Sequence, residues 1–431
     1  MQTPSVASTL LPTLGLAGLA FGLGAVFNSL GRWQNLETQV PEFITLGLAA
    51  GVLYLAAIYL VERYRLDSPA LLIILLGAVM FRVAVLPSAP SLSTDLYRYQ
   101  WEGRVQRLHI NPYTVTPATP GLRELEDPRH PFETGRTVST VYPPLSEWSF
   151  SWARTLPGYK RLYTGLDMAA VALLLALLGA LGRPPHRVLA YAWNPTVIVS
   201  FAMCGHHDAL AIVTLLAAIL FIIHRNPAVS VSFLALSVLS KFFSLLLLPV
   251  ILKRSRAAYA ALFAAVVAVA YLPYLGAGRG LFAGLSDYAT GWEGNDSLFR
   301  LIRAAGNSKA QAELVAAVVV LMLVAHALQS RMEPLGAAFF LLAGFLFLSP
   351  NAFPWYFTWI VPFLCFYSRA PLLLVSVTCV LGYAPVVAYA AGQPYRDSPF
   401  ILALEYAPVF GWLTFQGWQE IRNSRMESRN S

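Results

Sequence analysis

Long apolar runs separated by short polar segments dominate the amino-acid sequence. Most runs approach the roughly 20 residues that a helix needs to cross the hydrocarbon core of a membrane. They occupy residues 9–30, 42–61, 69–87, 160–182, 188–203, 208–224, 228–252, 257–275, 312–330, 335–348, 354–367, 371–391 and 398–416. The pattern predicts an all-α fold, a polytopic transmembrane bundle of about 12–14 helices. Because Ser240 and Lys241 interrupt the run 228–252, we interpret that run as two half-spans in a hairpin with Lys241 at its tip.

Composition narrows the class of protein. Of the 431 residues, 57% are hydrophobic and 12% are charged, and the mean hydropathy is +0.58. These values exclude an ordinary soluble enzyme. The three cysteines are dispersed at apolar positions, so we expect neither a disulfide framework nor a metal site, and nothing predicts a cofactor. Without an internal repeat or a separate soluble stretch, residues 1–431 are predicted to form a single integral membrane domain.

One long polar insertion, residues 88–159, interrupts the apolar pattern. Two close prolines, Pro87 and Pro90, end the preceding span, and Ser93 or Thr94 is placed to cap a new helix. From Ser93 to Arg104 the sequence reads Ser-Thr-Asp-Leu-Tyr-Arg-Tyr-Gln-Trp-Glu-Gly-Arg. A polytopic membrane protein that keeps so many charges beside the membrane usually needs them for chemistry.

The helix expected over 95–108 would be amphipathic. Asp95, Arg98 and Glu102 would share one face, and Tyr97 and Trp101 would lie on the other. This pattern is typical of a helix at the membrane surface whose aromatic rings face lipid headgroups. A purely structural interfacial helix, held by salt bridges, is the alternative.

The distribution of basic residues predicts the orientation of the bundle. Summed over the short segments near 61–68, 183–187, 224–226, 253–256, 329–334, 367–370 and 417–431, lysine and arginine outnumber acids by 13 to 5. The positive-inside rule places these segments in the cytoplasm and the insertion 88–159 outside. The net charge of +8 is thereby explained by topology, and no nucleic-acid partner is expected.

Further polar motifs fall on the same predicted outer side. His206, His207 and Asp208 stand at a helix boundary, where a metal site is conceivable. Adjacent histidines on a helix diverge by roughly 100°, however, so orienting a sugar hydroxyl or a lipid phosphate suits them better. Arg300 and Arg303 share a helical face, which fits a phosphate clamp and an interfacial anchor equally well.

Aromatic residues and one lysine complete the candidates. Tyr142 precedes a helix that is predicted to start at Pro144, and it either stacks on a sugar or serves the structure. For Trp355 and Tyr356 we favour an aromatic belt at the membrane interface, and the alternative is a wall that contacts a lipid or a sugar. Lys241 is costly in an apolar hairpin, so it must snorkel or meet an anion.

The polar motifs together resemble a known family. The stretch from Asp95 to Arg104, followed by Asn111-Pro112-Tyr113, Tyr142-Pro143-Pro144, Gly205-His206-His207-Asp208 and Pro354-Trp355-Tyr356, is similar to motifs of the GT-C membrane glycosyltransferases. The closest likeness is to bacterial mannosyltransferases that use polyprenyl-phosphate sugars. It extends from about Asp95 to about Tyr356, and only its first motif is specific.

The resemblance implies an inverting hexosyltransferase of the cell membrane, with mannose as the expected sugar and a glycan, glycolipid or protein hydroxyl as acceptor. It implies Asp95 as the general base. A departing phosphate needs cationic or hydrogen-bonding groups, and the candidates are Arg98, Arg104, His206, His207, Lys241, Arg300 and Arg303. Candidates for other substrate contacts are Tyr97, Glu102, Tyr142, Asp208, Trp355 and Tyr356.

A lipid or sugar transporter, or a flippase, is the alternative from another class. It would need charged or broken-helix positions near the bilayer midplane and a repeat that relates its halves. The chain instead concentrates its charge in the predicted outer loops, and Asn194-Pro195 is its clearest broken position. The sequence therefore favours the enzyme.

Overall fold

The computed structural model describes residues 6–128, 130, 132, 135–253 and 256–430. Within these ranges the fold is all-α, as predicted, and contains isolated β-bridges but no strand. The longest helices are α1 (Val6–Gly31), α2 (Val40–Arg63), α3 (Ser68–Val85), α6 (Leu156–Ala180), α15 (Lys309–Gln329) and α20 (Pro399–Asn430). Helices of intermediate length are α4 (Asp95–Arg107), α5 (Pro144–Trp152), α9 (Asp208–Ile223), α10 (Pro227–Val238), α12 (Ala257–Tyr271), α13 (Ala283–Gly291), α16 (Pro334–Leu348) and α18 (Ala370–Thr378).

Shorter helical segments connect these helices. The α-helical ones are α7 (Leu189–Ala192), α8 (Pro195–Ile198), α11 (Leu248–Leu252), α14 (Leu298–Ala304), α17 (Val361–Leu364) and α19 (Val386–Ala390). The 3₁₀ segments are η1 (Pro112–Thr114), η2 (Arg123–Leu125), η3 (Pro185–Val188), η5 (Phe242–Leu247), η6 (Leu272–Phe282), η7 (Pro354–Trp359) and η8 (Cys379–Tyr383), and η4 (Val199–Met203) is a π-helix.

Seven helical segments of the described chain are long and apolar enough to cross a membrane: Leu10–Gly31, Val40–Arg63, Ser68–Val85, Leu156–Ala180, Ala257–Gly291, Lys309–Gln329 and Ala370–Ala390. Four shorter apolar segments accompany them, at Asp208–Ile223, Pro227–Val238, Phe242–Leu252 and Pro334–Leu348. Two apolar runs are not continuous helices, and the first of them breaks at the predicted position Asn194-Pro195. The run 188–203 folds into η3, α7, α8 and η4, and the run 354–367 folds into η7 and α17. Pro195 and Pro362, which lie inside these runs, explain the breaks, because a proline lacks the backbone donor that a continuous helix needs.

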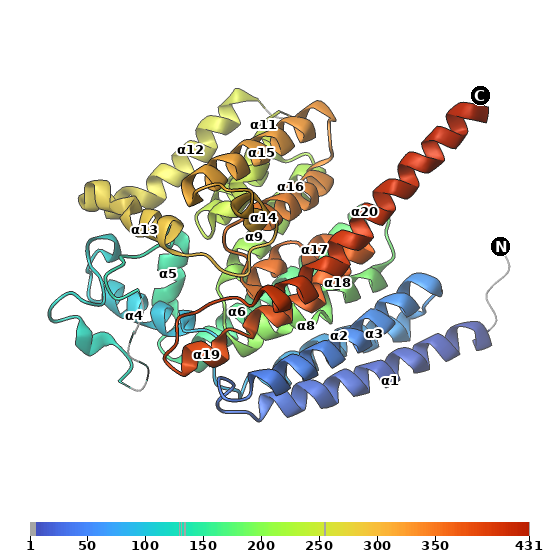
Figure 1. The fold of residues 1–431 in the computed structure, drawn as a ribbon, viewed down its shortest axis with the longest axis horizontal. Coiled ribbons are helices and arrows are strands. Elements are labelled where there is room, and N and C mark those ends of the chain that lie inside the picture. The colour runs from blue at the N-terminus through green and yellow to red at the C-terminus, as the bar shows by residue number, and fades with distance from the viewer. Residues whose placement is uncertain (1–5, 129, 131, 133–134, 254–255, 431) are drawn as a thin grey trace.

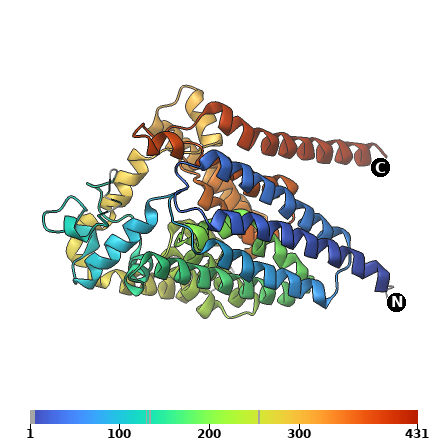
Figure 2. The same cartoon turned by 90° about the horizontal axis from the view of Figure 1, so that it is seen from below.

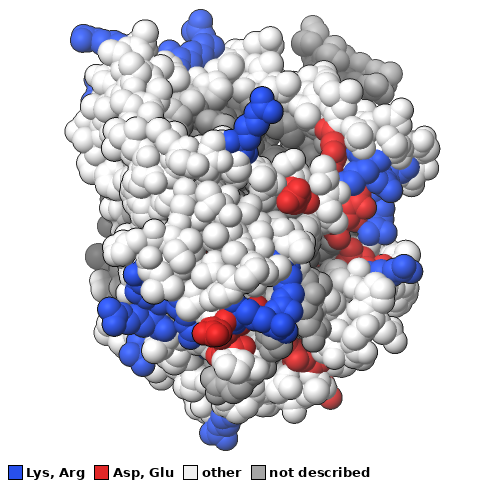
Figure 3. Space-filling model, turned by 90° about the vertical axis from the view of Figure 1, so that its left-hand side faces the viewer, with Lys and Arg blue, Asp and Glu red and all other residues white. Residues whose placement is uncertain are grey.

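The elements are arranged along one long axis, with the start of α1 and the end of α20 at one end and α4, α5 and α13 at the other (Figure 1). Figure 2 shows α1, α2 and α3 running beside one another along this axis. At the terminal end the His186 ring lies 2.7 Å from the carbonyl oxygen of Asp67, and Arg187 donates to the hydroxyl of Ser368. Segments that the charge pattern assigns to one side of the membrane are therefore neighbours. Figure 3 looks onto the opposite end, where basic and acidic side chains gather around a hollowed surface.

Helix α4 corrects one sequence prediction. Tyr97 and Trp101 are 6% and 1% exposed, so their rings do not face lipid headgroups as expected. They pack with Val105, Leu122 and Phe132, and the Trp101 indole donates to the carbonyl of Leu122. The segment after α4 folds back over the helix and supplies these apolar partners, which the helical periodicity alone does not reveal.

The broken position at Asn194-Pro195 is confirmed between α7 and α8. The Asn194 side-chain oxygen accepts from the backbone of Val197 and so caps α8, while its amide donates to Ser376. Arg82 of α3, which is buried, donates to the carbonyl of Ala192 at the end of α7 and pairs with the buried Asp167 of α6. These contacts fix the broken segment that leads into residues 205–208.

The hairpin predicted over 228–252 is also present. Helix α10 ends near Val238, and both η5 and α11 return beside it. Lys241 lies at the turn, and the carbonyl of Leu239 accepts from the backbone of Leu145 in α5. The tip of the hairpin is thereby attached to the insertion 88–159.

Candidate active site

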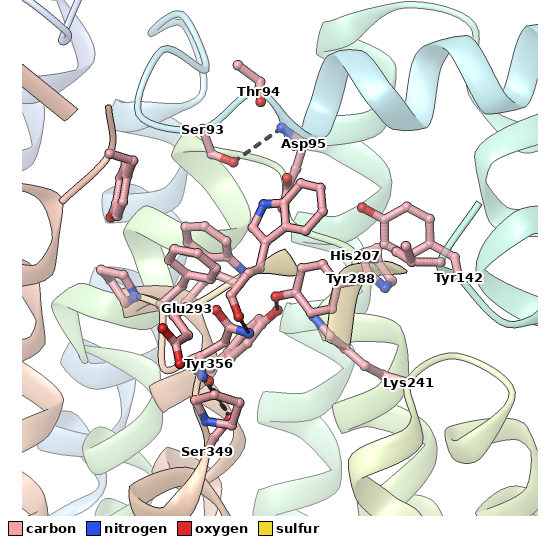
Figure 4. Close-up of a pocket in the computed structure, with 18 of the residues that line it drawn as sticks. Ser93, Thr94, Asp95, Tyr142, His207, Lys241, Tyr288, Glu293, Ser349 and Tyr356 are labelled. Carbon is pink, nitrogen blue, oxygen red and sulfur yellow. Dashed lines mark hydrogen bonds between the residues drawn. The ribbon is translucent and has the colours of Figure 1, made fainter. Parts of the chain in front are cut away.

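A cavity of about 670 Å³ opens at the α4 and α13 end of the molecule (Figure 4). Its volume falls within the roughly 300–1,000 Å³ typical of small-molecule sites. Segments far apart in the sequence form its wall: residues 91–95, 141–143, 240–243, 285–293, 349–359 and 383–395. The segments 91–95, 141–143, 240–243 and 349–359 contain polar or aromatic motifs that the sequence pattern singled out, whereas 285–293 and 383–395 do not.

Asp95 lies in the cavity wall at the first residue of α4. Thr94 occupies the N-cap position without a side-chain cap, and the hydroxyl of Ser93 accepts from the Asp95 backbone instead. The Asp95 side chain is 33% exposed, and its Oδ2 lies 3.4 Å from Nδ1 of His206. Burial raises the pKa of this carboxyl, but His206 and the charge of Lys241 outweigh burial and hold the pKa below its ordinary value. The carboxylate is therefore ionised at neutral pH.

The sequence Gly205-His206-His207-Asp208 distributes its side chains among separate partners. His206 faces Asp95 and stacks on Trp355, with the ring centroids 4.2 Å apart. His207 shares a hydrogen bond of 2.9 Å with the hydroxyl of Tyr99. Burial and the nearby charge of Lys241 lower the pKa of His207 to about 3, so its ring is neutral. The two rings diverge, as their adjacency predicted.

Gly205 makes this arrangement possible. Its φ of +73° is in the left-handed region that side-chain-bearing residues rarely adopt. A Cβ here would also lie 3.0 Å from a methyl of Leu96 and 3.1 Å from Cγ of Lys160. The glycine lets the chain leave η4 closely against α4 and brings His206 to Asp95.

Lys241 reaches the cavity from the tip of the hairpin. Its amine donates to Oδ1 of Asp208 at 2.6 Å, and the Trp359 indole donates to the same oxygen at 2.7 Å. The amine also lies 4.5 Å from the ring centroid of Tyr356, within cation–π range. Lys241 is the only lysine or arginine in the cavity wall among the residues described. Asp208 is fully buried, so it orients the lysine from behind.

Tyrosines complete the wall on this side (Figure 4). The hydroxyls of Tyr288 and Tyr356 are 2.9 Å apart, and Tyr142 lies beside His207 with ring centroids 5.0 Å apart. The helix after Tyr142 starts at Pro144, as predicted. Burial raises the pKa of Tyr142 well above its ordinary value, so it stays a hydrogen-bond donor.

Several candidates do not line the cavity. Arg98 donates to Glu102 and to the carbonyls of Gly135 and Val138, and Arg104 donates to the carbonyl of Leu125. Glu102, also in α4, is fully buried and does not line the cavity. Tyr97 belongs to the apolar cluster described above. Their predicted phosphate and substrate contacts gain no support, because the rest of the insertion already occupies these side chains.

Arg300 and Arg303 also lie outside the cavity wall. Arg300 pairs with Asp296 and Asp397, and Arg303 pairs with Glu293, whose side chain does line the cavity. Unlike Lys241, which is also paired with a carboxylate but lines the cavity, both guanidinium groups are held outside the cavity wall. Their predicted role as a phosphate clamp gains no support either.

The structure adds residues that the sequence analysis did not select. Glu37, Tyr288, Glu293, Asn351 and Trp359 all line the cavity. Trp359 follows Trp355 by one helical turn, so helical periodicity could have identified it. Nothing in the local sequence marks Glu37 or Tyr288 as a site residue. Among the residues described, no group of three or more His, Cys, Asp or Glu side chains is placed to hold a metal ion.

Comparisons with known families identify the chain. Residues 7–255 match the family described as alpha-(1->6)-mannopyranosyltransferase, N-terminal domain, and residues 279–414 match the MptB C-terminal domain. No curated protein matches the chain. The cavity draws on both regions, since Asp95, His207 and Lys241 come from the first and Tyr288, Trp355 and Tyr356 from the second. The chain therefore belongs to the alpha-(1->6)-mannopyranosyltransferase family and is a membrane glycosyltransferase that acts on mannose.

Proposed function

We propose that the protein transfers a mannosyl group from a polyprenyl monophosphate to an acceptor hydroxyl, with inversion at the anomeric carbon, on the extracytoplasmic face of the cell membrane. One observation carries the proposal. A single cavity holds an ionised carboxylate, Asp95, and one basic side chain, Lys241, on walls formed by different parts of the chain. A base for the acceptor and a cation for the leaving phosphate are the two groups that this reaction requires.

The reaction is a single displacement. The acceptor oxygen attacks the anomeric carbon, and Asp95 takes the proton of that hydroxyl. The bond between the anomeric carbon and the phosphate oxygen breaks, and its electron pair leaves with the polyprenyl phosphate. Lys241 stabilises the charge that develops on the phosphate. An α-linked product, as the family description names, would then come from a β-linked donor.

The surroundings of Lys241 suit a lipid-linked phosphate. Phe242, Phe243 and Phe345 line the cavity near the hairpin, and Trp359 stacks on Phe243 with ring centroids 4.4 Å apart. Such a wall accepts an isoprenoid chain better than a hydrated nucleotide. His206 and Asp208 act by positioning neighbouring side chains. His206 contacts Asp95, and Asp208 holds the amine of Lys241.

The extracytoplasmic assignment depends on charge. The cavity lies at the end opposite the segments over which lysine and arginine together outnumber acids, and such an excess favours the cytoplasm. Family membership also favours the enzyme over the transporter alternative, because the matching family is named for mannosyl transfer.

Purified protein assayed with a panel of donors tests the proposal. We expect mannose transfer from polyprenyl-phosphate mannose to a mannose-terminated acceptor, and no transfer from a nucleotide-linked mannose. Polyprenyl-phosphate glucose serves as the matched control for sugar choice. Transfer from the nucleotide sugar alone would contradict the proposed donor, and lipid translocation without transfer would restore the transporter.

A further inference from the structure

The charges of the cavity wall are unevenly distributed. Glu37, Asp95 and Glu293 are the acidic residues among those lining it, and they face a single lysine. Figure 4 places Glu293 and Lys241 on opposite sides of the Tyr288 and Tyr356 side chains. A phosphate is attracted to the lysine and repelled by the carboxylates. The side with Glu293 therefore suits a neutral ligand.

Residues 292–294 form a rigid ledge on this acidic side. The carbonyl of Trp292 accepts from the side chains of Asn351 and Lys309, at 3.1 and 3.3 Å. Gly294 forms backbone hydrogen bonds with Pro350 and Ala352. Arg303 holds one oxygen of the Glu293 carboxylate at 3.2 Å. The ledge is thus fixed from below while the Glu293 side chain stays 38% exposed.

Asn351 presents an unused acceptor beside the ledge. The residue is 4% exposed and lines the cavity, and its side-chain oxygen has no hydrogen-bond partner within the part of the chain that the structure describes. A buried polar atom without a partner is unfavourable unless a ligand satisfies it. A hydroxyl donor bound on the ledge would do so.

Aromatic rings border the same side. Trp292, which is half-buried, stacks on Tyr288 with ring centroids 5.5 Å apart, and Tyr389 also lines the cavity. Carboxylate and amide oxygens accept hydrogen bonds from hydroxyls, and aromatic faces supply large apolar contact area. This combination recognises a saccharide, which is neutral, rich in hydroxyls and apolar on its ring faces.

We propose that the Trp292–Glu293 ledge, with Asn351 beside it, is the acceptor subsite and binds the terminal sugars of a saccharide chain, and that Glu37, which lines the same cavity, adds to its negative charge. The inference rests on the proposed function and adds to it the place where the saccharide acceptor binds. The donor phosphate occupies the Lys241 side, and the acceptor hydroxyl reaches the anomeric carbon beside Asp95 from the ledge. The acidic border excludes anionic acceptors.

Glu293→Gln tests the subsite, because it keeps the shape of the side chain and removes its charge. The probe is a synthetic α-(1→6)-linked mannotetraose, and its KM and the KM of polyprenyl-phosphate mannose are measured separately. Losing a charge-assisted hydrogen bond predicts an acceptor KM raised by roughly tenfold or more and an unchanged donor KM. Glu42→Gln is the matched control, since Glu42 is exposed in the first turn of α2 and does not line the cavity. Glu37→Gln should change the acceptor KM in the same direction.

A direct binding measurement distinguishes failure of the acceptor subsite from failure of the proposed function. Mannotetraose binding is measured by ligand-observed NMR without donor, and thermal unfolding checks that each variant is folded. If the native protein transfers mannose but Glu293→Gln and Glu37→Gln keep native saccharide affinity and KM, the subsite is refuted and the proposed function stands. If the native protein binds mannotetraose with loss in Glu293→Gln, yet transfers nothing from polyprenyl-phosphate mannose, the donor assignment fails and the subsite stands.

Discussion

Replacing Lys241 by methionine removes the positive charge of the cavity and keeps a long apolar side chain. The single variant has two effects, because the amine also pairs with Asp208. Asp208 is fully buried, and breaking a buried ion pair by removing one partner costs about 3–5 kcal/mol. Lys241→Met alone should therefore lose much of its stability, and weak donor binding would be ambiguous.

The double variant Lys241→Met/Asp208→Asn separates stability from binding. The asparagine oxygen still accepts from the Trp359 indole, and no buried charge remains. Its stability should return close to that of the native protein, while the phosphate contact is still lost. A hydrogen bond to a charged group contributes about 1.5–3 kcal/mol, so the donor Kd should rise by roughly 10–150-fold.

The assay is equilibrium binding of polyprenyl-phosphate mannose to the protein in lipid nanodiscs, with thermal unfolding recorded in parallel. Asp208→Asn alone is the matched control, because its side-chain oxygen can still accept from the Lys241 amine and hold it in place, so donor binding should stay within a few-fold of that of the native protein. A stable double variant that binds donor as tightly as the native protein would refute the role of Lys241.

Three further changes test other parts of the site. His206→Ala removes the contact that lowers the pKa of Asp95 against the effect of burial, so this pKa should rise and the acid limb of the kcat/KM profile should move to higher pH. His206→Asn keeps a hydrogen-bond donor and should move the acid limb less. Identical pH profiles for the native protein and His206→Ala would contradict the contact. Gly205→Ala should lower the free energy of unfolding by about 1–3 kcal/mol, because the residue has a left-handed φ. It should also lower turnover by displacing His206. Native stability of this variant would show that the turn tolerates a side chain. Ala118 is exposed in the insertion, so Ala118→Cys should react with an impermeant thiol reagent in intact cells. Ser330→Cys should react only after the membrane is permeabilised. The reverse pattern would overturn the topology.

Sequence patterns predicted the elements that depend on local rules. The all-α class follows from apolar run length, the start of α4 at Asp95 follows from the two prolines and the Ser-Thr pair before it, and the hairpin at Lys241 follows from a charge inside an apolar run. Family resemblance supplied the motifs that turn out to share the cavity, including His207 and Tyr356.

Other features depend on contacts between distant segments. The predicted outward face of α4 is buried because residues after 112 fold over Tyr97 and Trp101, and helical spacing carries no information about that cover. Arginines on a polar helix face look the same in sequence whether they bind an anionic ligand or a carboxylate of the same chain. Arg98 and Arg300 bind carboxylates of the same chain. Glu37 reaches the site from the loop between α1 and α2, which no motif marks.

The base assignment is tested by Asp95→Asn, which is nearly isosteric and leaves Lys241 and the acceptor ledge in place. Proton transfer by a positioned group contributes about 10²–10⁴-fold, so single-turnover transfer should fall by about that factor while donor binding stays native. Glu124→Gln is the control, because Glu124 is an exposed carboxylate of the same insertion and does not line the cavity.

The anomeric configuration of the product, read by NMR against that of the donor, completes the measurement. Our account predicts an inverted product from the native protein and a rate loss of about 10²–10⁴-fold in Asp95→Asn. Near-native transfer by Asp95→Asn, or a product that retains the configuration of the donor, would contradict a single displacement with Asp95 as base.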